Sequence, residues 1–228
     1  KAAKGFQTAF RFTGFTKEKP MKIYTSQQMR EREQAAVDKG ATFEGPMENA
    51  GQAAAADLLR RLPEAGHALI VCGKGNNGSD GLVIARVLQA AGWCADIAFV
   101  AGSGLSELAE LNRRRLQGLA NIEIIAADEL EGRLKSGYTL IIDGIFGTGF
   151  TGALPANIAA VCRLLNRSDG LKAALDIPTG LNCDSGTADK DTFRADITYA
   201  FAAYKPAHLR EAGRAYCGET VCLDIGID

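Results

Sequence analysis

The sequence predicts an α/β fold, with one domain in which a mostly parallel central sheet is covered by helices on both faces. Short apolar segments, of which residues 67–72 are the first, alternate along the chain with helical patterns, and such alternation is typical of a parallel sheet. Segment 67–72 is almost continuously apolar, as in a strand that is buried on both faces. A length of 228 residues suits one such domain.

The elements are assigned in chain order. Ser26 can cap a first helix, which Gly40 ends, and Pro46 is a favourable first-turn residue for a second helix that reaches Leu62. Residues 73–81 are rich in glycine and are assigned to a turn. We expect strands at residues 67–72, 93–100, 122–125, 139–146, 171–177, 197–201 and 220–225, and further helices at residues 82–91, 106–119, 128–135 and 154–166.

Composition and charge argue against several classes of protein. A formal net charge of -1 gives no general attraction to phosphate backbones or anionic lipid, so we predict no nucleic-acid and no membrane partner. The six cysteines contain no C-x-x-C pair and mostly lie in apolar runs, which predicts reduced, buried thiols in a cytoplasmic protein. Two histidines without a Cys/His cluster argue against a zinc site.

Residues 1–20 differ from the rest of the chain. They carry five basic residues and one acidic residue, with phenylalanines between them, and the chain begins with Lys1. A tag or cloning remnant, a natural extension and a basic targeting peptide for an organelle all fit this pattern. Met21 opens a stretch that has the pattern of a natural start. We therefore predict a folded domain over residues 21–228, with residues 1–20 outside it.

The loop at residues 73–81 follows the first strand and leads into a helix. Its four glycines allow close approach of a ligand to the backbone, and the helix start offers free N–H groups to an anion. Asn76, Asn77 and Asp80 add oxygens for a ribose hydroxyl, a water or a cation. A tight turn capped by Ser79 or Asp80 is the alternative. The spacing matches neither common nucleotide motif, so the loop alone predicts only the phosphate end of a nucleotide.

Two further loops also follow strands, and each begins with an aspartate. Asp143 and Asp176 should lie at the carboxyl edge of the sheet, where ligands bind in such folds. Asn77, Asp143 and Thr179 could together hold a cation, either a monovalent ion or Mg²⁺. A plain cap on a glycine-rich turn is the alternative for Asp143. Lys205 follows another strand and could neutralise the acidic loops, act as an acid or anchor a phosphate, or be a surface lysine.

In combination, these residues resemble the family of NAD(P)H-hydrate epimerases, the YjeF N-terminal domain family. The segment Gly75-Asn76-Asn77-Gly78-Ser79-Asp80-Gly81 is similar to its G-N-N-G-G-D-G signature. The similarity continues over residues 21–228. It is carried by residues 47–51, 85–86, 143–149, 176–181, 195–198, 205–206 and 224–227.

The resemblance implies a three-layer, Rossmann-like domain that interconverts the R and S forms of hydrated NADH and NADPH. It implies a bound potassium ion held by Asn77, Asp143 and Thr179, a homodimer, and a dehydratase, fused or separate, that uses ADP or ATP. Carried over by position, the substrate contacts are Asn76, Asn77, Gly78, Ser79, Asp80, Gly147, Thr148, Gly149, Phe150, Thr151, Gly152, Ala153 and Asp176.

Three positions depart from the family pattern. Ser79 stands where glycine is usual, which is expected to add a side chain close to the ligand. Thr179 replaces the commoner serine and keeps the hydroxyl, and Tyr204 precedes the lysine where a smaller residue or proline is common.

Inversion at C6 of the hydrated nicotinamide requires loss and return of the hydroxyl, or opening and closing of the ring, and both routes move a proton at oxygen. We predict that Asp143 moves this proton while Lys205 and the cation set its charge state, with Asp176 as the reserve candidate. A non-catalytic nucleotide- or protein-binding module of the same fold is the main alternative. Retention of Asn76, Asn77, Asp80, Asp143 and Lys205 favours the enzyme.

Overall fold

The structure is a computed structural model that describes residues 21–38, 40 and 42–227. The predictions made for residues 1–20 lie outside these residues. Within the described part of the chain, seven strands form one sheet in the order β3-β2-β1-β4-β5-β6-β7. Every neighbouring pair is parallel. The strands are β1 (His67–Cys72), β2 (Cys94–Phe99), β3 (Ile122–Ile125), β4 (Leu140–Gly144), β5 (Leu171–Leu175), β6 (Ile197–Phe201) and β7 (Glu219–Leu223).

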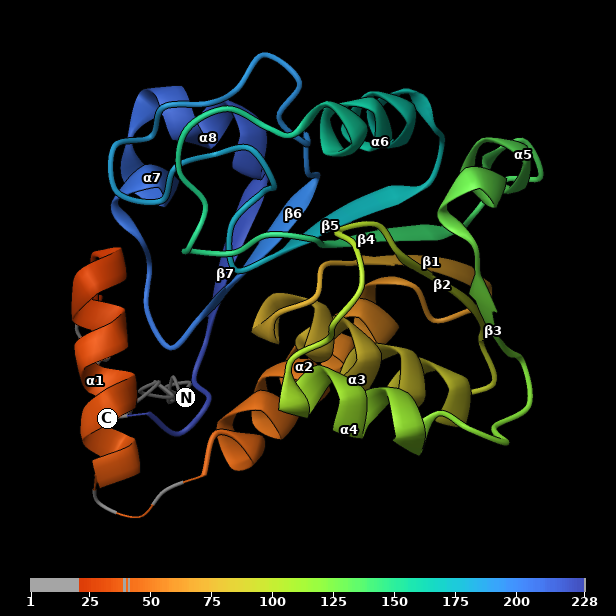
Figure 1. Ribbon diagram of the computed structural model, residues 1–228, viewed down its shortest axis with the longest axis horizontal. Coiled ribbons are helices and arrows are strands. Elements are labelled where there is room, and N and C mark those ends of the chain that lie inside the picture. The colour runs from red at the N-terminus through yellow and green to blue at the C-terminus, as the bar shows by residue number, and fades with distance from the viewer. Residues whose placement is uncertain (1–20, 39, 41, 228) are drawn as a thin grey trace, which may run out of the picture.

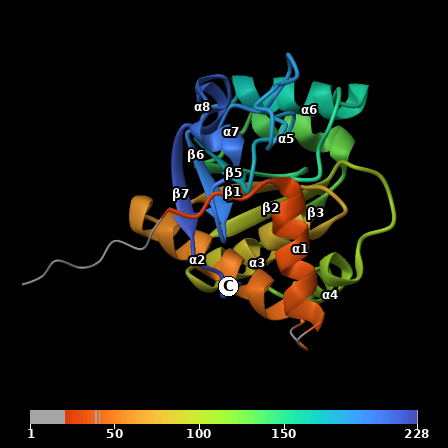
Figure 2. The same cartoon turned by 90° about the vertical axis from the view of Figure 1, so that its left-hand side faces the viewer.

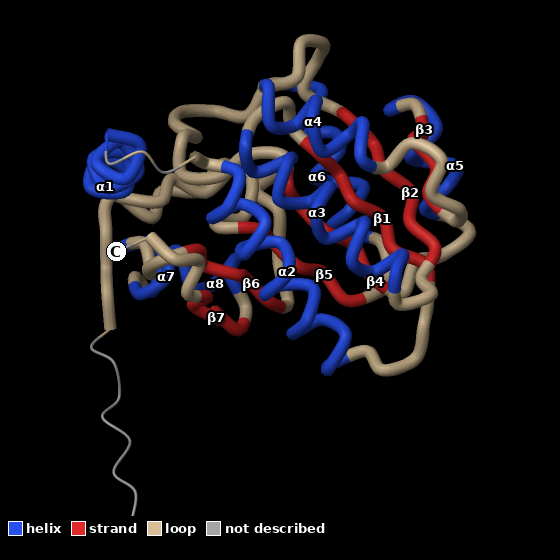
Figure 3. The backbone as a smooth tube through the Cα atoms, turned by 90° about the horizontal axis from the view of Figure 1, so that it is seen from below, coloured by secondary structure: helices blue, strands red, loops and turns tan. Residues whose placement is uncertain are grey.

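Helices cover both faces of this sheet, which confirms the predicted three layers (Figure 1). One face carries α2 (Glu44–Arg61), α3 (Asn76–Ala90) and α4 (Glu107–Arg115), which lie together in the view from below (Figure 3). The other face carries α5 (Leu130–Leu134), α6 (Ala156–Arg167), α7 (Pro206–Leu209) and α8 (Glu211–Cys217). A short 3-10 turn, η1 (Ala127–Glu129), precedes α5.

The strands are buried on both sides, as their continuous apolar sequence predicts. In β1, Ile70 packs into a hydrophobic cluster with α2 and α3, whereas its neighbours Leu69 and Val71 pack into a second cluster with α6. Successive side chains of a strand point to opposite faces. Two hydrophobic cores, one on each face, therefore hold the sheet in place.

The first helix, α1 (Ser26–Asp38), stands apart from both layers and faces the viewer in Figure 2. Met29 is its one buried residue among those described. The Ser26 backbone N–H and hydroxyl donate hydrogen bonds of 2.8 and 2.6 Å to the Asp184 carboxylate. Just before the helix, the Tyr24 N–H donates to the Tyr204 carbonyl over 2.9 Å. These contacts with a distant part of the chain position α1.

Several predicted boundaries are wrong. The helix that follows the glycine-rich loop begins at Asn76, six residues before the predicted start, so the loop proper is only Gly73–Gly75. Glycine disfavours helix, but Gly78 and Gly81 lie where a side chain would collide with the Gly73 carbonyl or with Ile70. Close packing, rather than helix propensity, therefore sets this helix start. The short helices α7 and α8 were not predicted.

The chain reverses direction across the sheet between β1 and β4. From β1 it proceeds outward to β2 and β3, and then returns to place β4 on the other side of β1. In open α/β sheets, ligands bind outside the carboxyl ends of the strands at this point. The loops after β1 and β4 meet there. No helix within the described residues is long and apolar enough to cross a lipid bilayer.

Candidate functional site

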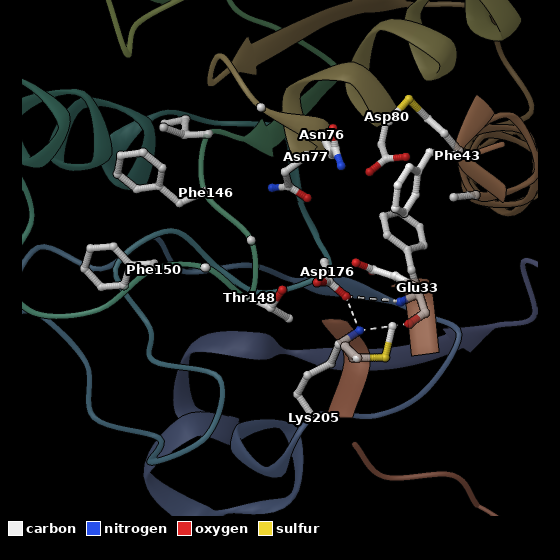
Figure 4. A pocket seen from close by; sticks show the side chains of 18 of the residues that line it. Glu33, Phe43, Asn76, Asn77, Asp80, Phe146, Thr148, Phe150, Asp176 and Lys205 are labelled. Carbon is white, nitrogen blue, oxygen red and sulfur yellow. Dashed lines mark hydrogen bonds and ion pairs between the residues drawn. The ribbon is translucent and has the colours of Figure 1, made fainter. Parts of the chain in front are cut away.

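A cavity of about 780 Å³ lies at the carboxyl edge of the sheet, beside the junction of β1 and β4 (Figure 4). This size is within the usual range for small-molecule sites. Most of the residues predicted to bind substrate line it. They are Asn76, Asn77, Asp80, Gly147, Thr148, Gly149, Phe150, Thr151, Ala153 and Asp176, together with Lys205.

The start of α3 forms one wall of this cavity. Gly75 is its N-cap, and no side chain caps the helix. The first amide groups of a helix lack partners within the helix, and the helix dipole places positive charge there. Asn76 and Asn77, the first two residues of α3, line the cavity. The arrangement is suited to a phosphate group, as the sequence predicts.

Two glycines allow this wall to form. A Cβ at Gly73 would lie 1.9 Å from the Ile145 carbonyl oxygen, and one at Gly78 would lie 2.3 Å from the Gly73 carbonyl oxygen. The loop after β1 is therefore pressed against both the loop after β4 and the first turn of α3. No other residue could replace either glycine without moving backbone.

An acid–base pair lies at the other end of the cavity. Asp176 follows β5 directly and forms an ion pair with Lys205, whose ammonium also donates to the Phe201 carbonyl oxygen over 2.8 Å. Lys205 is 1% exposed. Asp176 has a φ of 63°, a conformation that costs energy for a residue with a side chain and is concentrated at functional sites.

His208 supports this pair from behind. Its Nδ1 accepts a hydrogen bond of 3.0 Å from the Lys205 backbone N–H, so Nε2 carries the proton and donates to the Asp176 backbone carbonyl over 2.9 Å. Burial and the neighbouring Lys205 lower the pKa of His208 to about 4. At neutral pH, an uncharged His208 therefore holds the backbone of both catalytic candidates.

Asp143 lies beneath the cavity rather than on its wall. It is 0% exposed and does not line the cavity. Its carboxylate accepts hydrogen bonds from the Thr179 N–H (2.7 Å), the Thr179 hydroxyl (2.7 Å) and the Ile145 N–H (3.1 Å). Burial raises the pKa of Asp143 to about 6, although these hydrogen bonds oppose the rise. The interactions of this carboxylate within the described residues involve no lysine or arginine.

Asn77 lies close to this buried layer. Its backbone oxygen would be 3.0 Å from a Cβ at Gly144, the neighbour of Asp143, and its side chain would be 3.4 Å from a Cβ at Gly147. The Nδ2 atom of Asn77 is buried without a hydrogen-bond partner among the described residues. Nowhere in residues 21–38, 40 and 42–227 are three His, Cys, Asp or Glu side chains placed to hold a metal ion. A cation here would depend on amide and hydroxyl oxygens beside one carboxylate.

Some predicted contact residues do not reach the cavity wall. Gly78, Ser79, Gly152 and Thr179 are not among its lining residues. The expectation that Ser79 places a side chain close to the ligand is wrong for this structure, because Ser79 is fully buried and its hydroxyl accepts a hydrogen bond of 2.9 Å from Asn112. The side chain of Ser79 therefore joins α3 to α4 on the far side of the helix.

The sequence analysis missed the contribution of α1. Glu33 and Met29 line the cavity, one turn apart on this helix. The Glu33 carboxyl points toward Asp176 (Figure 4). Burial, and then the charge of Asp176, raise the pKa of Glu33. Helical spacing predicts the helix, but it contains no signal for the contacts that turn Glu33 toward the site.

The cavity also has an aromatic end. The rings of Phe146 and Phe150 are stacked with their centroids 5.7 Å apart, away from the Asp176–Lys205 pair (Figure 4). A second cavity of about 410 Å³ shares Phe43 and Asn76 with the first. A single cavity is therefore lined by aromatic side chains, a helix start suited to an anion, and an acid–base pair.

Comparison with known proteins identifies similar chains. A protein of Rhodopirellula baltica named NAD(P)H-hydrate epimerase is 36% identical over 89% of this chain and 84% of its own length. One of the same name from Elusimicrobium minutum is 38% identical over 91% of this chain and 96% of its own length. The crystal structure of the yeast protein ynu0 has the same fold, with a TM-score of 0.77 at 24% identity over 89% of this chain and 87% of that chain.

Residues 44–207 match the family model described as YjeF-related protein N-terminus. The matched segment contains β1 to β6 and every predicted site residue. This chain belongs to the YjeF-related N-terminal domain family.

Proposed function

We propose that this chain is an NAD(P)H-hydrate epimerase, which interconverts the R and S forms of hydrated NADH and NADPH. The observation that carries the proposal is the cavity, in which an anion-binding helix start and an acid–base pair share one space. Relatives that carry this name are similar to the chain over nearly its whole length. The retained polar residues also give no support to a non-catalytic binding module.

The substrate is proposed to extend along the cavity. Its pyrophosphate lies against the start of α3, where free N–H groups and the helix dipole attract an anion. The hydrated nicotinamide lies beside Asp176 and Lys205, and the aromatic rings of Phe146 and Phe150 are left for the adenine. This placement puts C6 of the hydrated ring next to the titratable groups of the site.

Asp176 is proposed to move the proton at the C6 oxygen. It lines the cavity, is paired with Lys205, and can exchange a proton with a bound hydroxyl. Asp143, the first choice from the sequence, is buried beneath the cavity, and its oxygens accept hydrogen bonds from Thr179 and Ile145 rather than facing the substrate space. Because an acid–base group must reach the proton that it moves, the geometry favours the reserve candidate Asp176.

Asp143 is proposed to hold a potassium ion together with Asn77 and Thr179. A buried carboxylate that lacks a cationic partner and a buried amide that lacks a hydrogen-bond partner are both costly. Rotation of the Asn77 amide would present its oxygen, and a monovalent ion would balance the single carboxylate. When bound, the ion would supply positive charge beneath the cavity and favour the ionised form of Asp143.

The epimerase proposal is tested with the pure R form of NADH hydrate. Purified protein is expected to produce the S form well above the uncatalysed rate, and more so with potassium chloride than with an equal concentration of sodium chloride. Chiral or reversed-phase chromatography separates the two forms. Equal rates with and without protein, in both salts, would overturn the proposal.

Other predictions concern partners. A Pyrobaculum aerophilum protein named bifunctional NAD(P)H-hydrate repair enzyme Nnr is 38% identical, and the match covers 79% of this chain and 37% of that protein. We propose that a dehydratase, fused or separate, acts on the same hydrates as this chain and uses ADP or ATP. A homodimer and a cytoplasmic location stay predictions, and light scattering on purified protein tests the first.

A further inference from the structure

Asp80 is a buried carboxyl group that the mechanism proposed above does not use. It lies in the second turn of α3, is 8% exposed and lines the cavity. Its carboxyl points into the space between α3 and Asp176 (Figure 4). No described residue forms a hydrogen bond with its side chain. Buried carboxyl groups are nearly always hydrogen-bonded within the protein, so this one is available to a ligand.

The charged groups that face Asp80 are mostly acidic. Asp176 and Glu33 are carboxyl groups, and Lys205 is the one cation that acts on Asp80 among the described residues. Lys205 is already paired with Asp176. Burial, followed by the charges of Asp176 and Glu33, raises the pKa of Asp80 well above its usual value, and Lys205 only partly opposes this. The surroundings of Asp80 therefore favour its protonated form, whereas Asp176 forms an ion pair with Lys205.

We propose that Asp80 is a second catalytic residue, which gives its proton to the C6 hydroxyl as that group leaves the ring, while Asp176 takes a proton from the water that returns. This inference rests on the proposed epimerase function and assigns its chemistry to two carboxyl groups. Inversion moves the oxygen from one face of the ring to the other. Asp80 on α3 and Asp176 after β5 reach the cavity from two different elements, as an inversion of this kind needs (Figure 4).

The step balances in atoms and charge. The C6–O bond breaks with its electron pair on oxygen, the Asp80 proton joins that oxygen, and water forms. The lone pair of N1 forms an N1=C6 double bond, so the ring becomes a cation. Two carboxylates, Asp80 and Asp176, then face two cations, the ring and Lys205.

Water adds to C6 from the other face, its proton passes to Asp176, and the N1 lone pair is restored. The opposite inversion runs with Asp80 and Asp176 exchanged, and proton exchange with solvent returns the free enzyme to its starting state.

Glu33 gives this set its excess of negative charge. Glu33 faces both Asp176 and Asp80, and the positive charges of Lys205 and then Arg30 act on it in the opposite direction. Opening of the ring, the other route to inversion, creates no cation and gains nothing from that charge. The excess carboxyl groups therefore favour loss of the hydroxyl. Glu33 acts through the charge state of Asp80, as a positioning residue carried on α1.

The test compares the wild type with Asp80→Asn and Glu33→Gln across a range of pH. Asp80→Asn keeps the shape of the side chain, and kcat is expected to fall by about 10²-fold or more. The fall of wild-type kcat at high pH, which follows loss of the Asp80 proton, should be absent from the remaining activity. Glu33→Gln removes a charge that faces Asp80, so the same fall should begin roughly half a pH unit or more lower. Circular dichroism confirms that each variant is folded, and Asp96→Asn, far from the cavity, is the matched control.

Oxygen exchange provides the second measurement. Epimerisation in H₂¹⁸O is expected to place one labelled oxygen in each product molecule that has been inverted, because the original hydroxyl leaves as water. Near wild-type kcat in Asp80→Asn, or inversion that retains the unlabelled oxygen, would overturn this inference and leave the epimerase function in place. A wild-type protein that does not accelerate inversion would overturn the epimerase function itself, and this inference with it.

Discussion

Two buried carboxylates lie at opposite edges of the same sheet, and they are satisfied in different ways. Toward the amino edge, Asp96 accepts a hydrogen bond of 2.6 Å from the Tyr138 hydroxyl. It also lies 3.0 Å from Nε2 of His67 and 3.6 Å from the Arg133 guanidinium. The ring of His67 packs on that of Tyr138, with 4.7 Å between centroids. The Asp96 carboxylate therefore finds its interaction partners among side chains of the protein itself.

At the carboxyl edge, the corresponding cluster is incomplete. Asp143 is as deeply buried as Asp96, but it accepts hydrogen bonds only from the neutral groups of Thr179 and Ile145. Asn77 has a buried amide atom without a partner among the described residues. A buried polar group that lacks a partner costs free energy. The comparison teaches that a buried charge and a buried donor without partners, rather than burial alone, distinguish the edge of the sheet where the cavity lies.

The largest expected effect is on catalysis at the carboxyl edge of the sheet. Asp176→Asn removes the group that we propose exchanges the proton, so kcat is expected to fall by about 10²- to 10⁴-fold. The variant also removes the negative charge that is paired with the buried Lys205 ammonium, so its rate is measured at a temperature where circular dichroism shows it to be folded. Asp96→Asn at the amino edge serves as the control. Near wild-type turnover in Asp176→Asn would show that the Asp176 carboxylate does not take part in the mechanism.

Asp143→Asn tests whether a cation binds beside Asp143 at the carboxyl edge of the sheet. In the wild type, potassium chloride is expected to raise the melting temperature more than sodium chloride at equal ionic strength. That difference should be absent from Asp143→Asn and retained in Asp96→Asn. Equal responses of the wild type to both salts would contradict the potassium site.

The same variant should also change the pH dependence of stability. The pKa of Asp143 is raised from 3.8 to about 6 in the folded protein, so the folded state binds more protons between these values. Its contribution to stability is therefore present below pH 3.8 and is lost as the pH rises through 6. The size is on the order of 3 kcal/mol. In potassium-free buffer, Asp143→Asn should lack this slope in denaturant titrations, and an unchanged slope would contradict the assignment.

Local sequence was sufficient to predict much of the sheet. The bounds of β1, β3 and β6 coincide with the predicted strands, because each is a short segment of mostly apolar residues. The parallel order then brings Asp143 and Asp176 to one edge, as predicted. Whether each lies on the cavity wall or beneath it depends on the loop that carries Thr179, which hydrogen-bonds Asp143 from 36 residues away along the chain.

The missed features all depend on distant contacts. Ser79 turns away from the ligand because Asn112 of α4 binds its hydroxyl. Glu33 reaches the site because Ser26 docks on Asp184, 158 residues later in the chain. The start of α3 depends on the fit of Gly78 against Gly73. Periodicity and propensity describe a segment by itself, so neither could have predicted these three features.

Asp96→Asn is expected to have a smaller effect, and on stability alone. The amide can still accept from Tyr138, but it loses the charge that faces His67 and Arg133. The free energy of unfolding should fall by about 1–3 kcal/mol, measured by urea titration. Turnover should stay near the wild-type value because the cluster lies at the edge of the sheet away from the cavity. A large loss of turnover without loss of stability would show that the two edges are coupled.

The smallest expected effect tests which side of α3 faces the ligand. Ser79→Ala removes the hydroxyl that accepts from Asn112, and the amide nitrogen of Asn112 then keeps the weaker contact of 3.5 Å with the Met47 sulfur. The free energy of unfolding is expected to fall by roughly 1 kcal/mol, while KM for either hydrate stays near its wild-type value. A several-fold change in KM at unchanged stability would instead place the Ser79 side chain on the cavity wall, as the family resemblance implies. The hydroxyl cannot serve both neighbours at once, because α3 separates the cavity from Asn112.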